Sequence, residues 1–250
     1  MTHPQQPSTC AKRGPGSTPF GTRLPGRRPM HEAAKEVLGR AKAVLLDFDG
    51  PVCSVFAGHP ADQVASDLVE LLRRRGTSIP AELGSESDPM EVLRWSGIHS
   101  PENLIAVEDR LIHAECVAVE SAEQTVGVGE VMHSIVASGR SVAVVSNNCE
   151  AAIAKYLGLH GLGGLPAFIS GRAYADPALM KPNPHSLHVA IKVLGVSPAD
   201  VILIGDTTSD VAASIAAGVK SIGYANKPGK AEALSLAGAD AVVDSMAFLL

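Results

Sequence analysis

Acidic side chains stand directly after two apolar runs of the sequence, and a lysine stands in a loop sequence between these runs. The residues are Asp47 and Asp49 at the end of the run 43–48, Lys181 in MKPNP, and Asp206 and Asp210 in GDTTSD after the run 201–205. Carboxylates brought this close together raise each other's pKa unless a cation lies among them. A site with oxygen ligands only suits Mg²⁺, and a lysine beside it is a compact positive charge suited to phosphate.

Asp47 and Asp49 are separated by one residue, Phe48. Since side chains alternate along a strand, both carboxylates should face the same side and Phe48 the other. At a rise of about 3.3 Å per residue, their Cα atoms would lie roughly 6–7 Å apart. One phosphoryl group could fit between them.

Small hydrogen-bonding side chains lie at the end of another apolar run, 141–146, and directly after it. They are Ser146, Asn147 and Asn148. A helix is expected to begin close to Asn148, and its free amide groups together with Ser146 would attract an anion. Lys181 precedes a proline, which restricts its backbone and stiffens its loop. Metal, lysine and helix start all favour added negative charge, so the sequence predicts a phosphate pocket.

The apolar runs alternate with helical patterns, which predicts an α/β fold: a Rossmann-like parallel sheet with helices on both faces. The predicted strands are 43–48, 141–146, 166–170, 201–205, 220–225 and 240–244, and the predicted helices are 31–41, 149–157, 184–194, 208–217 and 229–237. In open parallel sheets, ligands bind outside the carboxyl ends of the strands. The residues named above follow those ends, so we expect them to meet at one edge.

The segment 54–126 interrupts this alternation. It contains no convincing strand and three helical stretches, at about 60–75, 88–96 and 101–125. We therefore expect a helical cap domain at 54–126, inserted into a core domain made of 31–53 and 127–250. Residues 1–30 are rich in Pro, Gly, Ser and Thr and have no acidic residue, so a disordered tail is expected there.

Composition excludes several classes of protein. The chain has 250 residues and a formal net charge of −5, so nothing globally basic indicates nucleic-acid binding. No apolar run reaches roughly eighteen residues, so no membrane span is expected. The four cysteines fit neither a CxxC nor a zinc spacing and are typical of a reduced, cytoplasmic protein. Arg27 and Arg28 precede a charged segment, not an apolar signal core, so export is not expected. The oligomeric state is open.

The motifs DFDG, VVSNN, KPNP and GDTTSD, in this order and with an insertion after the first, resemble the haloacid-dehalogenase-like hydrolases over about residues 43–250. The insertion position resembles members with a helical cap, such as phosphoglycolate-phosphatase-like and β-phosphoglucomutase-like enzymes. The resemblance implies that Asp47 is the nucleophile and that Asp49 is the general acid and then the general base. It also implies that Ser146, Asn147 and Lys181 bind the phosphoryl group. Mg²⁺ would be held by Asp47, Asp206 and the backbone carbonyl of Asp49, with Asp210 acting directly or through water.

One position departs from the family pattern. Threonine or valine usually follows the DxDG motif, whereas this chain has Pro51. Proline removes an amide hydrogen and a hydroxyl from the turn, which puts the geometry of the following loop in question.

The leading hypothesis is a Mg²⁺-dependent phosphatase of small soluble phosphomonoesters that acts through an aspartyl phosphate on Asp47. A sugar phosphomutase shares all of these motifs, and a non-catalytic phosphate-binding protein on the same scaffold is a further alternative. Asp49 and GDTTSD argue against a dehalogenase. The absence of lysine between Lys42 and Lys155 argues against a phosphonatase with a Schiff-base lysine in its cap. The cap offers His59, Arg94, Trp95 and Arg110 without a recognisable pattern, so the sequence does not define the natural substrate.

Overall fold

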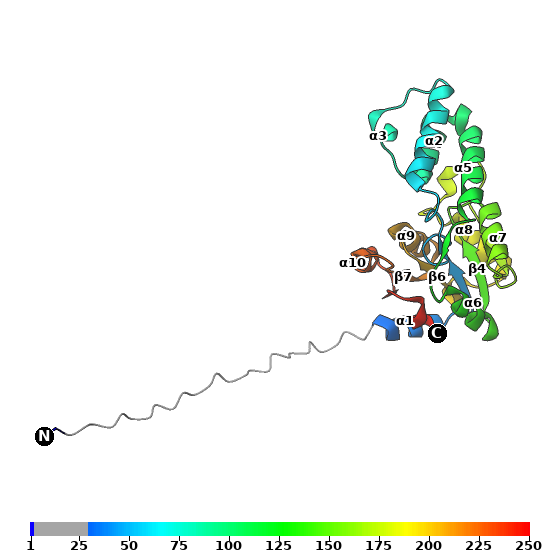
Figure 1. Ribbon diagram of the computed structural model, residues 1–250. Helices are drawn as coiled ribbons and strands as arrows, with labels where there is room; N and C mark the ends of the chain where they lie inside the picture. Colours follow the sequence, from blue (N-terminus) through cyan, green and yellow to red (C-terminus); the bar gives the residue numbers. More distant parts are fainter. Residues whose placement is uncertain (3–29) are drawn as a thin grey trace.

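The computed structural model describes residues 1–2 and 30–250, so the disordered tail predicted for 1–30 falls almost wholly outside the described residues. The chain forms a parallel sheet with helices on both faces and a group of helices beyond one edge of the sheet (Figure 1). This confirms the expected fold class. Of the helices in the described ranges, none is long and apolar enough to cross a membrane.

Six parallel strands make the central sheet, in the order β5-β4-β1-β6-β7-β8. Their bounds are β1 (Ala43–Leu46), β4 (Ser141–Val145), β5 (Phe168–Ser170), β6 (Val201–Gly205), β7 (Lys220–Tyr224) and β8 (Ala241–Val243). β1 lies in the middle and pairs with β4 on one side and β6 on the other. The chain leaves β1 towards β4 and later returns to β6, so the strand order reverses at β1. Ligands bind at such reversal points in α/β sheets.

The strands are apolar on both faces because helices cover both. Ala43 and Leu45 pack into one core with α8 and α9, whereas Val44 and Leu46 pack into the other core with α1, α6 and α7. The helices are α1 (Met30–Gly39), α6 (Val128–Ala137), α7 (Glu150–Leu159), α8 (His185–Leu194), α9 (Thr208–Ala217) and α10 (Lys230–Ala237). Short 3₁₀ turns complete the core domain at η2 (Pro177–Leu179), η3 (Pro198–Asp200) and η4 (Met246–Leu249).

The inserted helices form a cap with its own apolar core. They are α2 (Ala61–Arg74), α3 (Ala81–Gly84), α4 (Pro89–His99), η1 (Pro101–Asn103) and α5 (Leu104–Ala118). In α2, Val64, Leu68 and Leu72 recur every four residues, which places them on one buried face of the helix. That face packs against α4 and α5, and the cap stands beyond the carboxyl ends of the strands (Figure 1).

Two short strands connect cap and core. β2 (Cys53–Ser54) and β3 (Glu123–Gln124) pair antiparallel where the chain leaves and re-enters the core. Two predictions were therefore wrong near the end of the insertion: that 54–126 contains no strand, and that one helix covers 101–125. The helix ends at Ala118, and the chain turns back to pair with β2. The domain division at 54 and 126 stays a prediction.

Helix α6 was not among the helices predicted from the sequence. Its buried residues Val128, Val131, Met132 and Ile135 have helical spacing, a signal that could have revealed it. One glycine, Gly129, and several β-branched residues mask this signal, because both kinds of residue lower helix propensity. The helix begins after Gly127, which has a left-handed φ of 84° and supplies no capping side chain.

Candidate active site

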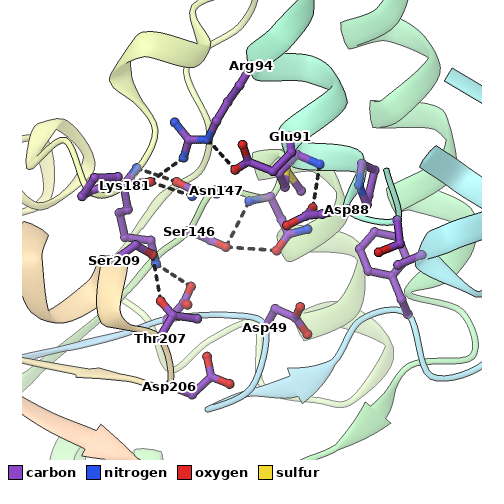
Figure 2. A pocket seen from close by; sticks show the side chains of 18 residues that line it. Asp49, Asp88, Glu91, Arg94, Ser146, Asn147, Lys181, Asp206, Thr207 and Ser209 are labelled. Atoms are coloured by element: carbon purple, nitrogen blue, oxygen red, sulfur yellow. Dashed lines mark hydrogen bonds and ion pairs between the residues drawn. The ribbon is translucent and has the colours of Figure 1, made fainter. Parts of the chain in front are cut away.

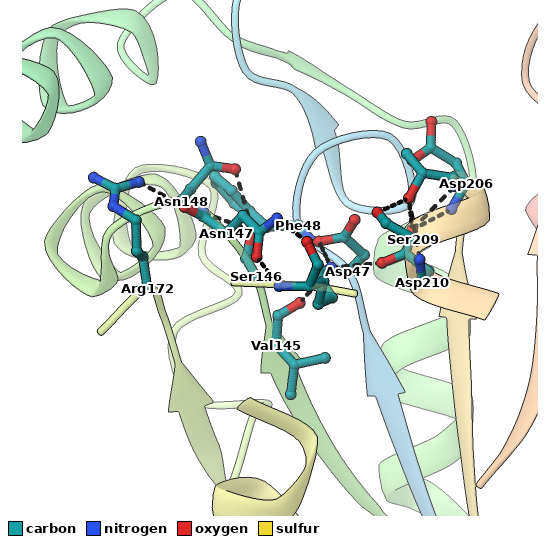
Figure 3. A network of polar contacts seen from close by, with 12 residues as sticks. Asp47, Phe48, Val145, Ser146, Asn147, Asn148, Arg172, Asp206, Ser209 and Asp210 are labelled. Atoms are coloured by element: carbon teal, nitrogen blue, oxygen red, sulfur yellow. Dashed lines mark hydrogen bonds and ion pairs between the residues drawn. The ribbon is translucent and has the colours of Figure 1, made fainter. Parts of the chain in front are cut away.

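A cavity of about 620 Å³ lies between the carboxyl ends of the strands and cap helix α4. Six predicted site residues line it: Asp47, Asp49, Ser146, Asn147, Lys181 and Asp206. Asp210 is buried behind them and reaches the site through Lys181. The structure thus brings every predicted site residue to one place (Figures 2 and 3).

Asp47 is the first residue after β1, and it is held from two sides. Its amide continues the sheet by donating to the Ile204 carbonyl at 2.9 Å. Its Oδ1 accepts from the Phe48 amide at 2.7 Å and from Lys181 Nζ at 2.8 Å. Burial, reinforced by Asp210 nearby, raises the pKa of Asp47, while the charge of Lys181 acts in the opposite direction. Phe48 points away into the core, with its ring 5.3 Å from that of Tyr156.

Asp49 faces the open cavity and is exposed to solvent there. Its Oδ1 accepts from the Val55 amide at 3.0 Å, in the strand segment that leads to the cap. Protein atoms surround the carboxyl group on its other sides, and this desolvation raises its pKa. A carboxyl group with a raised pKa is suited to give and take a proton near neutral pH.

Pro51 does not disrupt the turn after Asp49, because the hydrogen bonds of this turn come from the amide groups of other residues. The Gly50 amide donates to the Cys53 carbonyl at 2.7 Å, and the Val52 amide donates to the Phe48 carbonyl at 3.1 Å. Gly50 itself has φ of 99°, and a Cβ there would lie 2.4 Å from Cγ of Asp206. Position 50 therefore requires glycine for two reasons: the Asp206 side chain leaves no space for a Cβ atom, and the backbone has a left-handed φ.

Gly50→Ala should lose activity and metal affinity, because the added methyl group must displace the Asp206 carboxylate. Gly76→Ala is the matched control: Gly76 also has a left-handed φ, 83°, but nothing lies within 4 Å of a Cβ there. The Gly76→Ala variant should keep its activity, and its free energy of unfolding should fall by about 1–3 kcal/mol because of backbone strain. Thermal unfolding together with phosphatase assays over a range of Mg²⁺ concentrations separates the two effects. Equal behaviour of both variants would show that the contact with Asp206 is unimportant.

Lys181 is buried between two carboxylates. Its Nζ lies 2.8 Å from Asp47 Oδ1 and 2.6 Å from Asp210 Oδ1. Burial alone would lower the pKa of Lys181, but these two charges outweigh it and raise the pKa. Asn147 fixes the loop by accepting from the Lys181 amide at 2.8 Å and donating to its carbonyl at 3.3 Å. Lys181 is therefore a fixed, fully charged group.

Asp206 and Asp210 are placed by the start of α9. Thr207 caps this helix: its Oγ1 accepts from the Asp210 amide at 3.2 Å. In return, Asp210 Oδ2 accepts from the amides of Thr207 at 3.0 Å and Asp206 at 3.1 Å. Both oxygens of Asp210 are thus engaged by protein groups. Asp206 Oδ2 accepts from Asn226 at 3.3 Å and also contacts Lys230 Nζ.

The carboxylates fit a divalent cation. One oxygen each from Asp47, Asp206 and Asp210 lies within 4.8 Å of the others, and all three residues are buried. Within residues 30–250, no protein group is found hydrogen-bonded to Asp47 Oδ2 or to Asp206 Oδ1. Burial raises the pKa of Asp206 as it does that of Asp47, and a cation among these carboxylates would favour their ionised form. A donor set of carboxylate oxygens suits Mg²⁺.

Ser146 lies at the cavity wall as predicted, but the helix start near Asn148 is not free to bind phosphate. Ser146 Oγ lies 3.1 Å from Asn148 Oδ1 and accepts from the Asn148 amide, so the hydroxyl is fixed at the cavity wall. The helix start near Asn148, expected to attract phosphate, is already occupied. Glu115 of the cap accepts from the Cys149 amide at 3.1 Å and from the Asn148 side chain at 3.0 Å.

Glu115 belongs to a buried ion cluster that the sequence analysis missed (Figure 3 shows its arginine, Arg172, beside the 145–148 loop). Arg172 follows β5 and contacts Glu108 at 2.7 Å, Glu115 at 2.9 Å and the Asn147 carbonyl at 2.6 Å. All three charged side chains are fully buried, and Glu108 Oε2 has no partner among the described residues. The cluster fastens cap helix α5 to the loop that carries Ser146. No local motif predicts it, because its members are far apart in the sequence.

Of the cap residues considered from sequence, only Arg94 lines the main cavity. His59 and Arg110 line a separate surface hollow, and Trp95 packs beside His99. The structure adds Asp88 and Glu91, which the sequence analysis did not single out. They lie at the start of α4, so their position next to the cavity depends on how the cap folds back over the core.

The comparison with known proteins agrees with this geometry. The family model described as haloacid dehalogenase-like hydrolase matches residues 89–224, more than half of the chain. The chain belongs to the haloacid dehalogenase-like hydrolases. The motif resemblance is thereby confirmed, and so is the expectation of an enzyme of the hydrolase class.

Relatives of this haloacid dehalogenase-like hydrolase include named phosphatases. It is 31% identical over 226 residues to the plasmid phosphoglycolate phosphatase of Cupriavidus necator, covering 82% of this chain and 89% of that protein. It is 26% identical over 214 residues to the phosphoglycolate phosphatase of Pectobacterium atrosepticum, covering 84% and 91%. A putative haloacid dehalogenase-like hydrolase from Bacteroides fragilis has the same fold, with a TM-score of 0.66, 19% identity and coverage of 84% and 100%.

Proposed function

We propose that this hydrolase is a Mg²⁺-dependent phosphatase of small soluble phosphomonoesters, with Asp47 as nucleophile and Asp49 as general acid and base. The observation that carries the proposal is the position of Asp47. Its Oδ1 is held by Lys181 at 2.8 Å, and one of its carboxylate oxygens lies within 4.8 Å of oxygens of Asp206 and Asp210. The phosphatases among its relatives support the reaction class.

The first displacement transfers the phosphoryl group to the enzyme. Asp47 attacks phosphorus, so that a bond forms between its carboxylate oxygen and phosphorus while the ester P–O bond breaks. Asp49 gives its proton to the departing oxygen. The charge of Lys181 offsets the negative charge on the phosphoryl oxygens. The Ser146 hydroxyl, which donates to Asn148 Oδ1 at 3.1 Å, would turn to donate to one of these oxygens.

The second displacement releases phosphate. Asp49, now ionised, accepts a proton from a water molecule that attacks the aspartyl phosphate, and the Asp47 carboxylate is restored. Asp47 and Asp206, with the backbone carbonyl of Asp49, would hold the metal. Mg²⁺ supplies positive charge that lets an anionic ester approach an anionic nucleophile. Asp210 orients Lys181 at 2.6 Å and so acts as a positioning residue.

The test of the proposal is release of inorganic phosphate from p-nitrophenyl phosphate. Activity is expected with Mg²⁺, and chelation with EDTA should abolish it because the buried carboxylates are then left without their counter-charge. Added Mg²⁺ should restore it. Full activity in the presence of EDTA would contradict the assigned metal site.

The proton-donor role of Asp49 predicts an effect that depends on the leaving group. With an alkyl phosphate, Asp49→Asn should lower kcat/KM by about 10²–10⁴-fold, the usual contribution of a general acid. With p-nitrophenyl phosphate the loss in kcat/KM should be much smaller, because a phenolate of low basicity departs without a proton. Equal losses for both substrates would assign Asp49 a role other than proton transfer to the leaving group.

The two alternatives can be separated in the same assay. A sugar phosphomutase would convert a sugar 1-phosphate into an isomeric sugar phosphate instead of releasing phosphate. A non-catalytic binding protein would do neither, although phosphate would still protect it against thermal unfolding.

A further inference from the structure

The cavity has an acidic wall on its cap side. Cap helix α4 and the residues before it contribute Ser87, Asp88, Glu91 and Arg94 to the lining. Figure 2 shows Asp88 and Glu91 across the cavity from Asp49 and Asp206. Asp88 and Glu91 are exposed, so their charges face the space left for the part of the substrate beyond its phosphate.

Arg94 offsets only one of these two acidic charges, because it pairs with Glu91. Its Nη2 donates to the Lys181 carbonyl at 2.5 Å, and its Nε lies 3.1 Å from Glu91 Oε1. Its Nη1 donates more weakly to the Pro177 carbonyl, at 3.4 Å. Arg94 thus links cap helix α4 to the loop that contains Lys181. Two acidic residues against this one arginine leave the cap side of the cavity with a net negative charge.

The core side of the cavity is balanced separately. Lys181, Lys230 and a bound divalent cation would offset the four carboxylates Asp47, Asp49, Asp206 and Asp210. The excess negative charge of the cap wall lies nearest to the space for the leaving group. A carboxylate there, as in phosphoglycolate, would be repelled, whereas an ammonium group would be attracted.

The size of the cavity points in the same direction. Sites of a few hundred Å³ accept molecules much larger than a two-carbon acid. A volume of about 620 Å³ leaves room for a sugar ring beside the phosphate.

We infer that the preferred substrates are phosphate esters of sugar size whose leaving group carries an ammonium group, recognised by Asp88 and Glu91. This inference rests on the proposed phosphatase function. Asp88 Oδ1 also caps α4 by accepting from the Met90 amide at 2.8 Å. Asparagine keeps such a cap, so Asp88→Asn removes the charge and leaves the helix start intact.

The experiment compares two sugar phosphates that differ only at C2, where one carries an ammonium group and the other a hydroxyl group. With the full chain and Mg²⁺ at pH 7, kcat/KM for glucosamine 6-phosphate should exceed that for glucose 6-phosphate by about two- to fivefold, the size expected for partly exposed charge pairs. Phosphoglycolate should be the poorest of the three. The double variant D88N/E91Q should bring the ratio of the two sugar phosphates close to one. Glu82→Gln, an exposed α3 residue outside the cavity, should leave the ratio unchanged.

The outcomes are distinguishable. An equal preference for both sugar phosphates, an unchanged ratio in D88N/E91Q, or a preference for phosphoglycolate overturns the inference while p-nitrophenyl phosphate is still hydrolysed. Failure to hydrolyse p-nitrophenyl phosphate with Mg²⁺ overturns the proposed function and this inference with it.

Discussion

Asp47→Asn is expected to lower phosphatase activity by about 10⁴-fold or more, the scale seen when a catalytic nucleophile is removed. The amide has nearly the same shape as the carboxylate, and its oxygen can still accept from Lys181 and from the Phe48 amide, which now bond to Asp47 Oδ1 at 2.8 and 2.7 Å. The loss would therefore reflect chemistry and not folding. Measured kcat/KM for p-nitrophenyl phosphate, with circular dichroism to check the fold, tests this.

Asp200→Asn is the matched control for this variant. Asp200 lies before β6, at the amino end of the strand and so at the opposite edge of the sheet, and pairs with exposed Lys42 at 2.8 Å. Such surface pairs contribute about 0–1 kcal/mol to stability, so both activity and folding should stay near those of the wild type. If Asp47→Asn kept activity comparable to that of Asp200→Asn, Asp47 would not be the nucleophile.

Arg172→Met is expected to have the largest effect on stability. It leaves Glu108 and Glu115 fully buried without their positive partner, and breaking a buried ion pair in this way costs about 3–5 kcal/mol. The loop that carries Ser146 should also loosen, because the Asn147 carbonyl loses its 2.6 Å donor. Urea denaturation monitored by circular dichroism measures the change in the free energy of unfolding.

Arg110→Met provides the control with the same substitution. Arg110 is exposed and pairs with exposed Asp67 at 3.0 Å, so its loss should change the free energy of unfolding by about 1 kcal/mol or less. Adding Glu108→Gln and Glu115→Gln to Arg172→Met should recover part of the stability, because no unpaired buried charge remains. Equal effects of Arg172→Met and Arg110→Met would show that the cluster does not link cap and core.

Much of the site was predictable because its residues follow strands. The apolar runs that contain β1, β4 and β6 are readable from the sequence, and the carboxyl ends of parallel strands meet at one edge. This rule alone brings Asp47, Ser146 and Asp206 together. Helices with strong spacing, such as α2 and α9, were also placed within a residue or two of their observed bounds.

The features that were not predicted from the sequence depend on contacts between distant segments. Arg172 meets Glu108 and Glu115 only because α5 of the cap lies beside the loop that follows β5, and single-sequence patterns carry no such information. The same holds for the occupation of the α7 start by Glu115. The pairing of β2 with β3 is only two residues long on each side, too short for an alternating pattern to be visible.

The most direct test of the account is chemical detection of the phosphorylated enzyme. The Asp49→Asn variant is mixed with Mg²⁺ and p-nitrophenyl phosphate, quenched in acid and digested, and the peptides are analysed by mass spectrometry. Since removal of Asp49 slows the attack of water, the account predicts a phosphoryl group on Asp47. Phosphate release without any phosphorylated Asp47, or a phosphoryl group on a different residue, would contradict it.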